Sequence, residues 1–407
     1  MRRPAGLDGA AASVHDARVI RCALPLVFLA ALASTAARAD FASCVASIKS
    51  EAAGQGVSRE TLSAAFDGLA PDLKVLDFEG SQPEFKTPIW DYLAALVDDE
   101  RVADGQAAMR REASSLALAE RKFGVDKYVI AAVWGVESNF GEGQGGRPLV
   151  QSLATLACEG SRRPAFYRGE LMATLKIADR GDIPLEKLNG SWAGAFGQTQ
   201  FMPSTFLRLA VDLDGTGRDI VDNPAAALGS TANYLAKSGW RTGEPWGFEV
   251  RLPDGYSGPS GRKSKHPMGF WADKGIARLD GKPLGSDDAG LLLPAGAEGP
   301  AFLVTRNFDV VYSYNAAESY ALAICILAQR MAGGPDIQTA WPTDDPGLSR
   351  KERRELQTLL ARHGYDVGAP DGAIGSKTQA AIADFQGKRG MTVNGRASQK
   401  VLEALGK

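Results

Sequence analysis

The stretch from Val125 to Glu137 constrains the fold of this chain most, because it is apolar almost all round. A helix without a polar face is a buried helix, so the stretch predicts a helix at the centre of a folded domain. Glu137 ends it and is followed by Ser138 and Asn139. A carboxyl group there is poorly solvated, and desolvation favours its neutral form, which suits a general acid. The structural alternative is a C-terminal glutamate capped by Ser138 or Asn139.

The composition agrees with a folded protein of several domains. The chain has 407 residues, of which 44% are hydrophobic and 23% charged. These values suit two to four domains of roughly 100 to 200 residues each and exclude a disordered or collagen-like chain. The formal net charge is only -2. Since nucleic-acid binding requires a basic surface, we expect no nucleic-acid partner.

An export signal is predicted over residues 1–39. Basic residues precede an apolar run from Cys22 to Ala33, and small residues then lead to a cleavage site after Ala39. The run is shorter than the roughly 18 residues that a membrane span needs, and Pro25 interrupts it. We therefore expect secretion and no transmembrane anchor.

Three cysteines remain after removal of this signal: Cys44, Cys158 and Cys325. An oxidising compartment allows one disulfide and leaves one thiol, and the sequence alone does not choose the pair. Lipid attachment at Cys44 is an alternative, but the preceding residues 41–43 lack the usual leucine three positions upstream.

The first domain combines helices with a smaller strand-rich lobe. Apolar residues three and four positions apart predict mostly helices from residue 41 to about 180. Between Trp246 and Ser313, short β-like runs alternate with Gly and Pro clusters, which predicts the strand-rich lobe. Helical spacing then returns from Tyr320 to Met331.

A second, smaller domain follows. Residues 335–348 have the composition of an interdomain linker. After them, three apolar helical stripes, which include Leu356, Ile382 and Leu402, predict a three-helix domain. We therefore divide the chain into four segments: an export signal (1–39), a first domain (40–334), a linker (335–348) and a three-helix domain (349–407).

Several common chemistries are excluded by the scarcity of histidine. The chain has three histidines; His15 leaves with the export signal, and His266 and His363 fall in different domains. A histidine-rich metal site or a Ser-His-Asp triad is therefore not expected. A G-x-G-x-x-G string begins at Gly141, but it follows a predicted helix where a nucleotide-binding fold needs a strand.

Two strings, Trp134–Gly141 and Gly190–Ser204, resemble lytic murein transglycosylases of the B type. The resemblance runs from about Cys44 to Gly334. It implies a mainly α (α+β) fold with a lysozyme-like catalytic domain in the periplasm. It also implies cleavage of the β-1,4 bond between N-acetylmuramic acid and N-acetylglucosamine without water. Shorter matches are Gln82–Phe85, Ser230–Tyr234 and Tyr314–Tyr320.

The resemblance also implies roles for single residues. Glu137 would protonate the leaving oxygen and then, as a carboxylate, take the proton from the muramoyl C6 hydroxyl as a 1,6-anhydro ring closes. Phe196 would pack beneath Glu137, and a core tyrosine is the alternative for Tyr320. Arg162 and Arg163 would meet peptide carboxylates, unless they are merely solvated. The residues expected to line the cleft are Ser191, Gln200, Tyr234, Tyr314, Asn315 and Tyr320.

Two rival functions stay open. Ordinary glycosidases use two carboxylates, and no second carboxylate accompanies the Glu137 or Gln200 motifs. This agrees with a one-acid mechanism, but a hydrolytic muramidase is still possible. A non-catalytic murein-binding scaffold is the rival from another class, and the intact Glu137, Ser191 and Gln200 argue against it.

A possible ion loop begins at Asp212. Its pattern follows the start of a calcium-binding loop, and B-type relatives carry a similar loop. Asn223, however, stands where a bidentate glutamate gives full affinity. We expect no required cofactor and at most a weakly held structural calcium ion, with a metal-free turn as the alternative. The candidate ligands are Asp212, Asp214, Thr216, Arg218 and Asn223.

The C-terminal stretch resembles the three-helix peptidoglycan-binding domain through residues such as Gly364, Tyr365, Asp371 and Phe385. These residues build turns and a small core, so they identify a fold better than a site. The implied role is to tether the enzyme to peptidoglycan glycan strands and raise the local substrate concentration. The sequence indicates no particular protein partner in cell-wall synthesis or remodelling.

Overall fold

The computed structural model describes residues 26–80 and 87–406, with side chains from Asp40 onward. The fold is mainly helical with one small lobe of strands, as predicted. The buried apolar side chains of the described residues form four cores: a central core, an N-terminal core, a sheet core and the core of the C-terminal domain.

The central core is built around two almost wholly buried helices, α6 and α13. In α6 every residue from Val129 to Gly135 is buried, which confirms the helix predicted from residues 125–137. Asp126 begins this helix by accepting a 2.7 Å hydrogen bond from the backbone N–H of Tyr128. The helices of this core are α3 (Ile89–Leu96), α4 (Asp99–Arg111), α5 (Ala113–Phe123), α6 (Lys127–Ser138), α10 (Pro224–Lys237), α12 (Arg306–Asn315) and α13 (Glu318–Met331).

The N-terminal core is closed by a disulfide. Cys44 bonds to Cys158 with a Cα–Cα distance of 5.8 Å, which settles the pairing, and the Cys325 thiol is buried in α13. Because its sulfur is in this bond, Cys44 is not a lipid attachment site. The elements here are α1 (Leu26–Gly54), α2 (Arg59–Phe66), η1 (Leu73–Phe78), β1 (Arg147–Pro148), α7 (Leu149–Cys158), α8 (Pro164–Asp179), η3 (Leu185–Lys187), β2 (Asn189–Gly190) and α9 (Pro203–Leu209).

The predicted export signal lies mostly outside the described residues. Helix α1 begins at Leu26 and includes Ala39. The signal and its cleavage site therefore stay a prediction. Within residues 26–80 and 87–406, no single helix has the length and apolarity of a membrane span; the bent pair of α12 and α13 passes by length and composition alone.

The predicted strand-rich lobe is an antiparallel sheet in the order β4-β6-β7-β3-β5. In its centre Phe248 pairs with Leu303, and both side chains are buried in the sheet core. The elements of this lobe are β3 (Gly247–Arg251), β4 (His266–Pro267), α11 (Met268–Asp273), β5 (Ala277–Arg278), β6 (Asp288–Leu292) and β7 (Ala301–Val304).

The C-terminal domain has its own core of three short helices, as predicted. Ser349 and Glu352 form a capping box at the start of its first helix, which satisfies the backbone N–H groups there. Leu356, Ile382 and Phe385 are buried between the helices. The three helices are α14 (Arg350–Arg362), α15 (Ser376–Lys388) and α16 (Gln399–Leu405).

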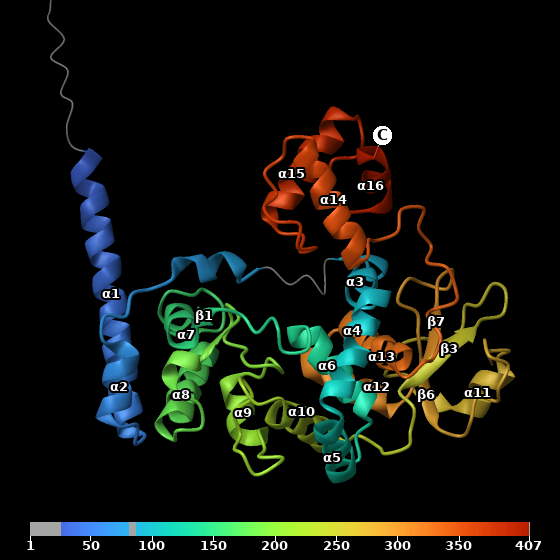
Figure 1. Ribbon diagram of the computed structural model, residues 1–407, viewed down its shortest axis with the longest axis horizontal. Helices are drawn as coiled ribbons and strands as arrows, with labels where there is room; N and C mark the ends of the chain where they lie inside the picture. The colour runs from blue at the N-terminus through green and yellow to red at the C-terminus, as the bar shows by residue number, and fades with distance from the viewer. Residues whose placement is uncertain (1–25, 81–86, 407) are drawn as a thin grey trace, which may run out of the picture.

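The segment predicted as a linker, 335–348, is packed against the rest of the molecule. The backbone N–H groups of Gln338 and Thr339 both donate to the Glu249 carboxylate at 2.8 Å. Leu348, at its end, is fully buried in the C-terminal core. The C-terminal domain is therefore held in place over α3 and α4 (Figure 1).

Candidate active site

Glu137 lies in the last turn of α6 and lines a cavity of about 810 Å³, here called the Glu137 cavity. Its predicted neighbours Asn315 and Tyr320 line the same cavity. The opposite side is lined by residues of the C-terminal domain, among them Arg353 and Arg396. Glu137 thus shares a cavity with residues of the C-terminal domain that lie more than 200 positions after it in the sequence.

The hydroxyl of Tyr320 donates a short hydrogen bond to Oε1 of Glu137. Tyr320 is both a core residue and a site residue, since its ring is buried in α13 while its hydroxyl meets the carboxylate. Burial raises the pKa of Tyr320 well above its ordinary value, and the charge of Glu137 raises it further. The phenol therefore stays protonated and keeps donating to Glu137.

Two further predicted tyrosines, Tyr234 and Tyr314, lie beside this pair but are not among the residues that line the Glu137 cavity. The ring of Tyr314 lies 4.7 Å from that of Tyr234 and 6.4 Å from that of Tyr320, centroid to centroid. Tyr234 donates to the backbone carbonyl of Ser313 at 2.7 Å, and Tyr314 to that of Thr199 at 2.8 Å. Burial, followed by the Glu137 charge, also raises the pKa of Tyr314 well above its usual range.

Gln198 joins the two motifs, and sequence reasoning missed it. Its side-chain oxygen accepts from the indole N–H of Trp134 at 2.9 Å, and its backbone carbonyl accepts from the Ser138 hydroxyl at 2.6 Å. Both partners flank Glu137 in α6. Gln198 lies inside the second motif, Gly190–Ser204, and this position is the sequence signal that could have identified it.

The end of α6 is held by unusual backbone conformations. Asn139 and Phe140 follow Glu137 with φ of 50° and 60°, and Gln200 has φ of 49°. Ala316, after Asn315, has φ of 48°. Left-handed backbone is uncommon away from glycine and persists only where the surroundings over-determine it. Among the residues that the structure describes, four of the five such non-glycine positions thus follow Glu137 or Asn315 closely or lie in the second motif.

Ser191 and Gln200 shape loops and do not line the Glu137 cavity. The Ser191 hydroxyl accepts from the backbone N–H of Ala195 at 3.1 Å. The Gln200 amide donates to the carbonyls of Gln144 and Gly197 at 3.0 and 2.9 Å. These bonds hold the second motif against the loop that follows Glu137.

Phe196 has no exposed surface and lies in the N-terminal core, with its ring 5.7 Å from that of Phe206. It is not among the residues that line the cavity, so it supports its loop from within and does not contact a ligand. Arg162 donates to Glu79, and Arg163 stacks 4.0 Å over Phe166, both away from the cavity.

The Asp212 loop is a compact turn whose side chains carry several oxygen atoms that could bind a cation. Asp212 accepts from the N–H of Gly215 at 2.7 Å, and Asp214 from the hydroxyl of Thr216 at 2.6 Å. Asn223 caps α10 with its side-chain oxygen and donates its amide to Thr216 at 2.7 Å.

The remaining candidate, Arg218, pairs with Asp182 at 2.5 Å; its guanidinium is a cation without an acceptor, so this residue could ligate calcium only through its backbone carbonyl. Within residues 26–80 and 87–406, no group of three or more His, Cys, Asp or Glu residues is placed to hold a metal. Two carboxylates and a hydroxyl fit a weakly held calcium ion better than a tight one.

Comparisons with known proteins identify the family of this chain. Residues 40–329 match the Transglycosylase SLT domain family, and residues 349–405 match a peptidoglycan binding domain family. The chain belongs to the Transglycosylase SLT domain family. Its curated relative, the membrane-bound lytic murein transglycosylase B of Escherichia coli, is 31% identical over 64% of this chain and 73% of that protein. The chain is therefore an enzyme, a lytic transglycosylase.

Solved structures of relatives extend the likeness, in one case over both domains. SltB3 from Pseudomonas aeruginosa, solved in complex with NAG-anhNAM-pentapeptide, is 44% identical, with 90% of this chain and 100% of that chain covered and a TM-score of 0.72. Slt35 of Escherichia coli, solved in complex with calcium, is 29% identical over 71% of this chain and 92% of that chain, with a TM-score of 0.61.

Proposed function

We propose that this SLT-domain enzyme works in the periplasm and cleaves the β-1,4 bond from N-acetylmuramic acid to N-acetylglucosamine in peptidoglycan without water. The product end is a 1,6-anhydromuramoyl residue. One observation supports this proposal most directly. Glu137, at the end of a buried helix, lines a cavity, and its carboxylate accepts a hydrogen bond from the hydroxyl of Tyr320.

Glu137 acts first as an acid and then as a base. Its carboxyl proton passes to O4 of the departing N-acetylglucosamine as the C1–O4 bond breaks. The C6 hydroxyl oxygen of the muramoyl residue then bonds to C1, and its proton returns to the Glu137 carboxylate. The hydrogen bond from Tyr320 stabilises the carboxylate stage, because it donates to the charged form.

The cavity contains a second carboxylate, that of Asp91, but its pairing does not suit the role that a second carboxylate has in hydrolysis. Asp91 lines the cavity, but Arg396 binds both of its oxygens, at 2.5 and 2.7 Å. A nucleophile or a base for water needs an available carboxylate oxygen. The pairing of Asp91 therefore favours the one-acid route over a hydrolytic muramidase.

The test is digestion of purified peptidoglycan with residues 40–407 and with the Glu137→Gln variant, followed by mass spectrometry of the soluble products. We expect products about 18 Da lighter than the hydrolytic ones, the mass of one water, and none from the variant. Reducing ends would identify a hydrolase. If both proteins gave the same products in equal amounts, Glu137 would not be the catalytic acid and base.

The export signal is part of the same proposal. Its basic, apolar and small-residue segments support cleavage after Ala39. Expression of the full chain in a Gram-negative host should release a periplasmic protein that begins at Asp40, as read by N-terminal sequencing. An uncleaved cytoplasmic protein would contradict it.

We also propose that the Asp212 loop binds calcium weakly as a structural ion, with no metal required for catalysis. Asp212, Asp214 and Thr216 offer oxygen ligands, which calcium prefers. When bound, the ion would only stiffen this turn before α10.

A further inference from the structure

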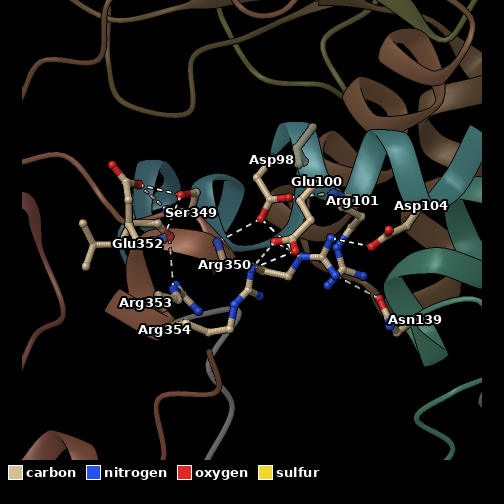
Figure 2. A network of polar contacts seen from close by, with 12 residues as sticks. Asp98, Glu100, Arg101, Asp104, Asn139, Ser349, Arg350, Glu352, Arg353 and Arg354 are labelled. Atoms are coloured by element: carbon tan, nitrogen blue, oxygen red, sulfur yellow. Dashed lines mark hydrogen bonds and ion pairs between the residues drawn. The ribbon is translucent and has the colours of Figure 1, made fainter. Parts of the chain in front are cut away.

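The C-terminal domain is fixed to the catalytic domain by ion pairs around α3 and α4. Arg350 donates to Asp98 at 2.9 Å through its backbone N–H and to Asp104 at 2.8 Å through its guanidinium (Figure 2). It also reaches the side-chain oxygen of Asn139, two residues after Glu137, at 3.2 Å. The domain is therefore tied to the loop that ends the catalytic helix.

Further pairs fix its other side. Arg354 contacts both oxygens of Glu100 at 2.7 Å. Arg396 lies between Asp91 and Asp345, with contacts to both carboxylates at 2.5 to 2.7 Å. The docked position thus makes the C-terminal domain one wall of the Glu137 cavity.

Arg353 differs from the arginines around it. It lines the Glu137 cavity from the first turn of α14, and its Nε donates to the backbone carbonyl of Leu348 at 3.0 Å. Among the described residues, no carboxylate oxygen lies within 4.0 Å of its guanidinium nitrogens. Its charge is therefore not compensated by direct contact.

The nearby acids are already engaged. Asp91 and Asp98 attract Arg353 from a distance, but Arg396 binds the first and Arg350 the second. Burial lowers the pKa of Arg353, as expected for a cation with too little water and no ion-pair partner. A bound anion would supply that partner.

We propose that Arg353 binds a carboxylate of the substrate's stem peptide, so that the C-terminal domain acts as a specificity element of the active site in addition to any tethering role. This rests on the proposed function, since the stem peptide is carried by the muramoyl residue whose bond Glu137 cleaves. A guanidinium matches a carboxylate with two parallel hydrogen bonds. Gln379 and Asn394, which line the same cavity, offer amides to the peptide backbone.

Two carboxylates could meet Arg353. In a muramoyl residue that bears a stem peptide, the free carboxylate is on the peptide. In a peptide-free muramoyl residue, the lactyl carboxylate next to the sugar ring is free instead. Ligands with and without the peptide therefore distinguish the two sources.

Binding is measured on the inactive Glu137→Gln protein, full mature chain, by isothermal titration. The ligands are N-acetylglucosaminyl-1,6-anhydromuramic acid with and without a pentapeptide. With Arg353→Gln added, we expect the affinity for the pentapeptide ligand to fall at least about 10-fold and that for the peptide-free ligand to change less than about 2-fold. Arg353→Lys should recover part of the loss.

Arg362→Gln is the matched control, because it removes the same charge from the exposed end of the same helix. It should leave both affinities unchanged. Unchanged binding in Arg353→Gln, or an equal loss for the two ligands, would overturn the proposal. Because binding is read without turnover, this result is separate from the digestion test of Glu137; unchanged thermal unfolding of Arg353→Gln shows that the domain stays docked.

Discussion

The two walls of the Glu137 cavity are held by different forces. On one side, α6 and α13 are buried helices, and their apolar packing places Glu137 and Tyr320. On the other side, the C-terminal domain is attached mainly through ion pairs such as Arg350 with Asp98 and Arg396 with Asp91. Apolar burial is barely weakened by salt, whereas exposed ion pairs are screened and largely buried pairs much less so. We therefore expect the docked wall to be more sensitive than the catalytic wall to the loss of a charged partner and, at its exposed pairs, to salt.

The largest effect is expected from Asp91→Ala. Asp91 is 5% exposed, and its loss leaves Arg396 with Asp345 as its remaining acidic partner. Breaking a buried pair costs about 3 to 5 kcal/mol, and we expect about 2 to 3 here because Asp345 remains. Calorimetry should then show the C-terminal domain melting apart from the catalytic domain.

Two variants control for this result. Removing both partners, Asp91→Ala with Arg396→Ala, should cost less than the sum of the single changes, since no charge is left unpaired. Glu403→Ala removes an exposed carboxylate from α16 and should not separate the two transitions. If the Asp91→Ala protein melts in the same way as the parent protein, the ion pairs do not hold the C-terminal domain against the catalytic domain.

The apolar wall is probed by Tyr320→Phe. This change keeps the ring in the core and removes the hydroxyl that donates to Glu137. A hydrogen bond to a charged group is worth about 1.5 to 3 kcal/mol, so kcat should fall about 10- to 100-fold. Because the pKa of Tyr320 is raised, the hydroxyl stays protonated, and the loss should persist from about pH 5 to pH 9.

Tyr314→Phe is the matched variant. Its hydroxyl donates to the carbonyl of Thr199 and not to Glu137. We expect kcat to change by less than about 3-fold, with a stability loss of about 1 kcal/mol for a neutral hydrogen bond. Equal kcat losses in the two variants would mean that the Tyr320 hydroxyl does not act through its hydrogen bond to Glu137.

The apolar wall could be predicted from the sequence, because periodicity and two motifs determine it. The largely apolar residues 125–137 indicated α6, and the match to relatives indicated Glu137, Tyr314 and Tyr320, which lie close together. Phe196 was placed at the site, but it belongs to the N-terminal core, since neighbours in a motif can point to opposite sides of a loop.

The docked wall could not be predicted in this way. The arginines at 350, 353, 354 and 396 look like the solvated charges of any small helical domain. Arg350, Arg354 and Arg396 pair with acidic residues between positions 91 and 104, and no local sequence pattern indicates a contact over such a separation. The linker composition even suggested independent domains, whereas the segment is anchored at Gln338 and Thr339 and at the buried Leu348.

The salt sensitivity of the joint gives a smaller effect. Arg354 and Glu100 form a partly exposed pair, with 35% and 41% of their side chains accessible. Such pairs contribute about 0.2 to 1 kcal/mol, so Arg354→Ala should weaken docking by roughly 0.5 kcal/mol at low salt and less in 1 M NaCl. Proteolysis within residues 335–348, measured with and without salt, reports this change. A rate that is independent of salt in both proteins would contradict an ionic joint.

The smallest effect is expected at the Asp212 loop, which forms part of neither wall of the Glu137 cavity. If calcium binds with a Kd near 1 mM, as weak loops do, 1 mM calcium stabilises the catalytic domain by about 0.4 kcal/mol. The melting transition of the catalytic domain should rise slightly and that of the C-terminal domain should not, as seen in the Asp91→Ala protein where the two are separate. Asp214→Asn should abolish the shift, because this carboxylate is one of the two acidic ligands. A calcium effect on the C-terminal transition would show that the loop and the joint are coupled, so the two walls would not be independent.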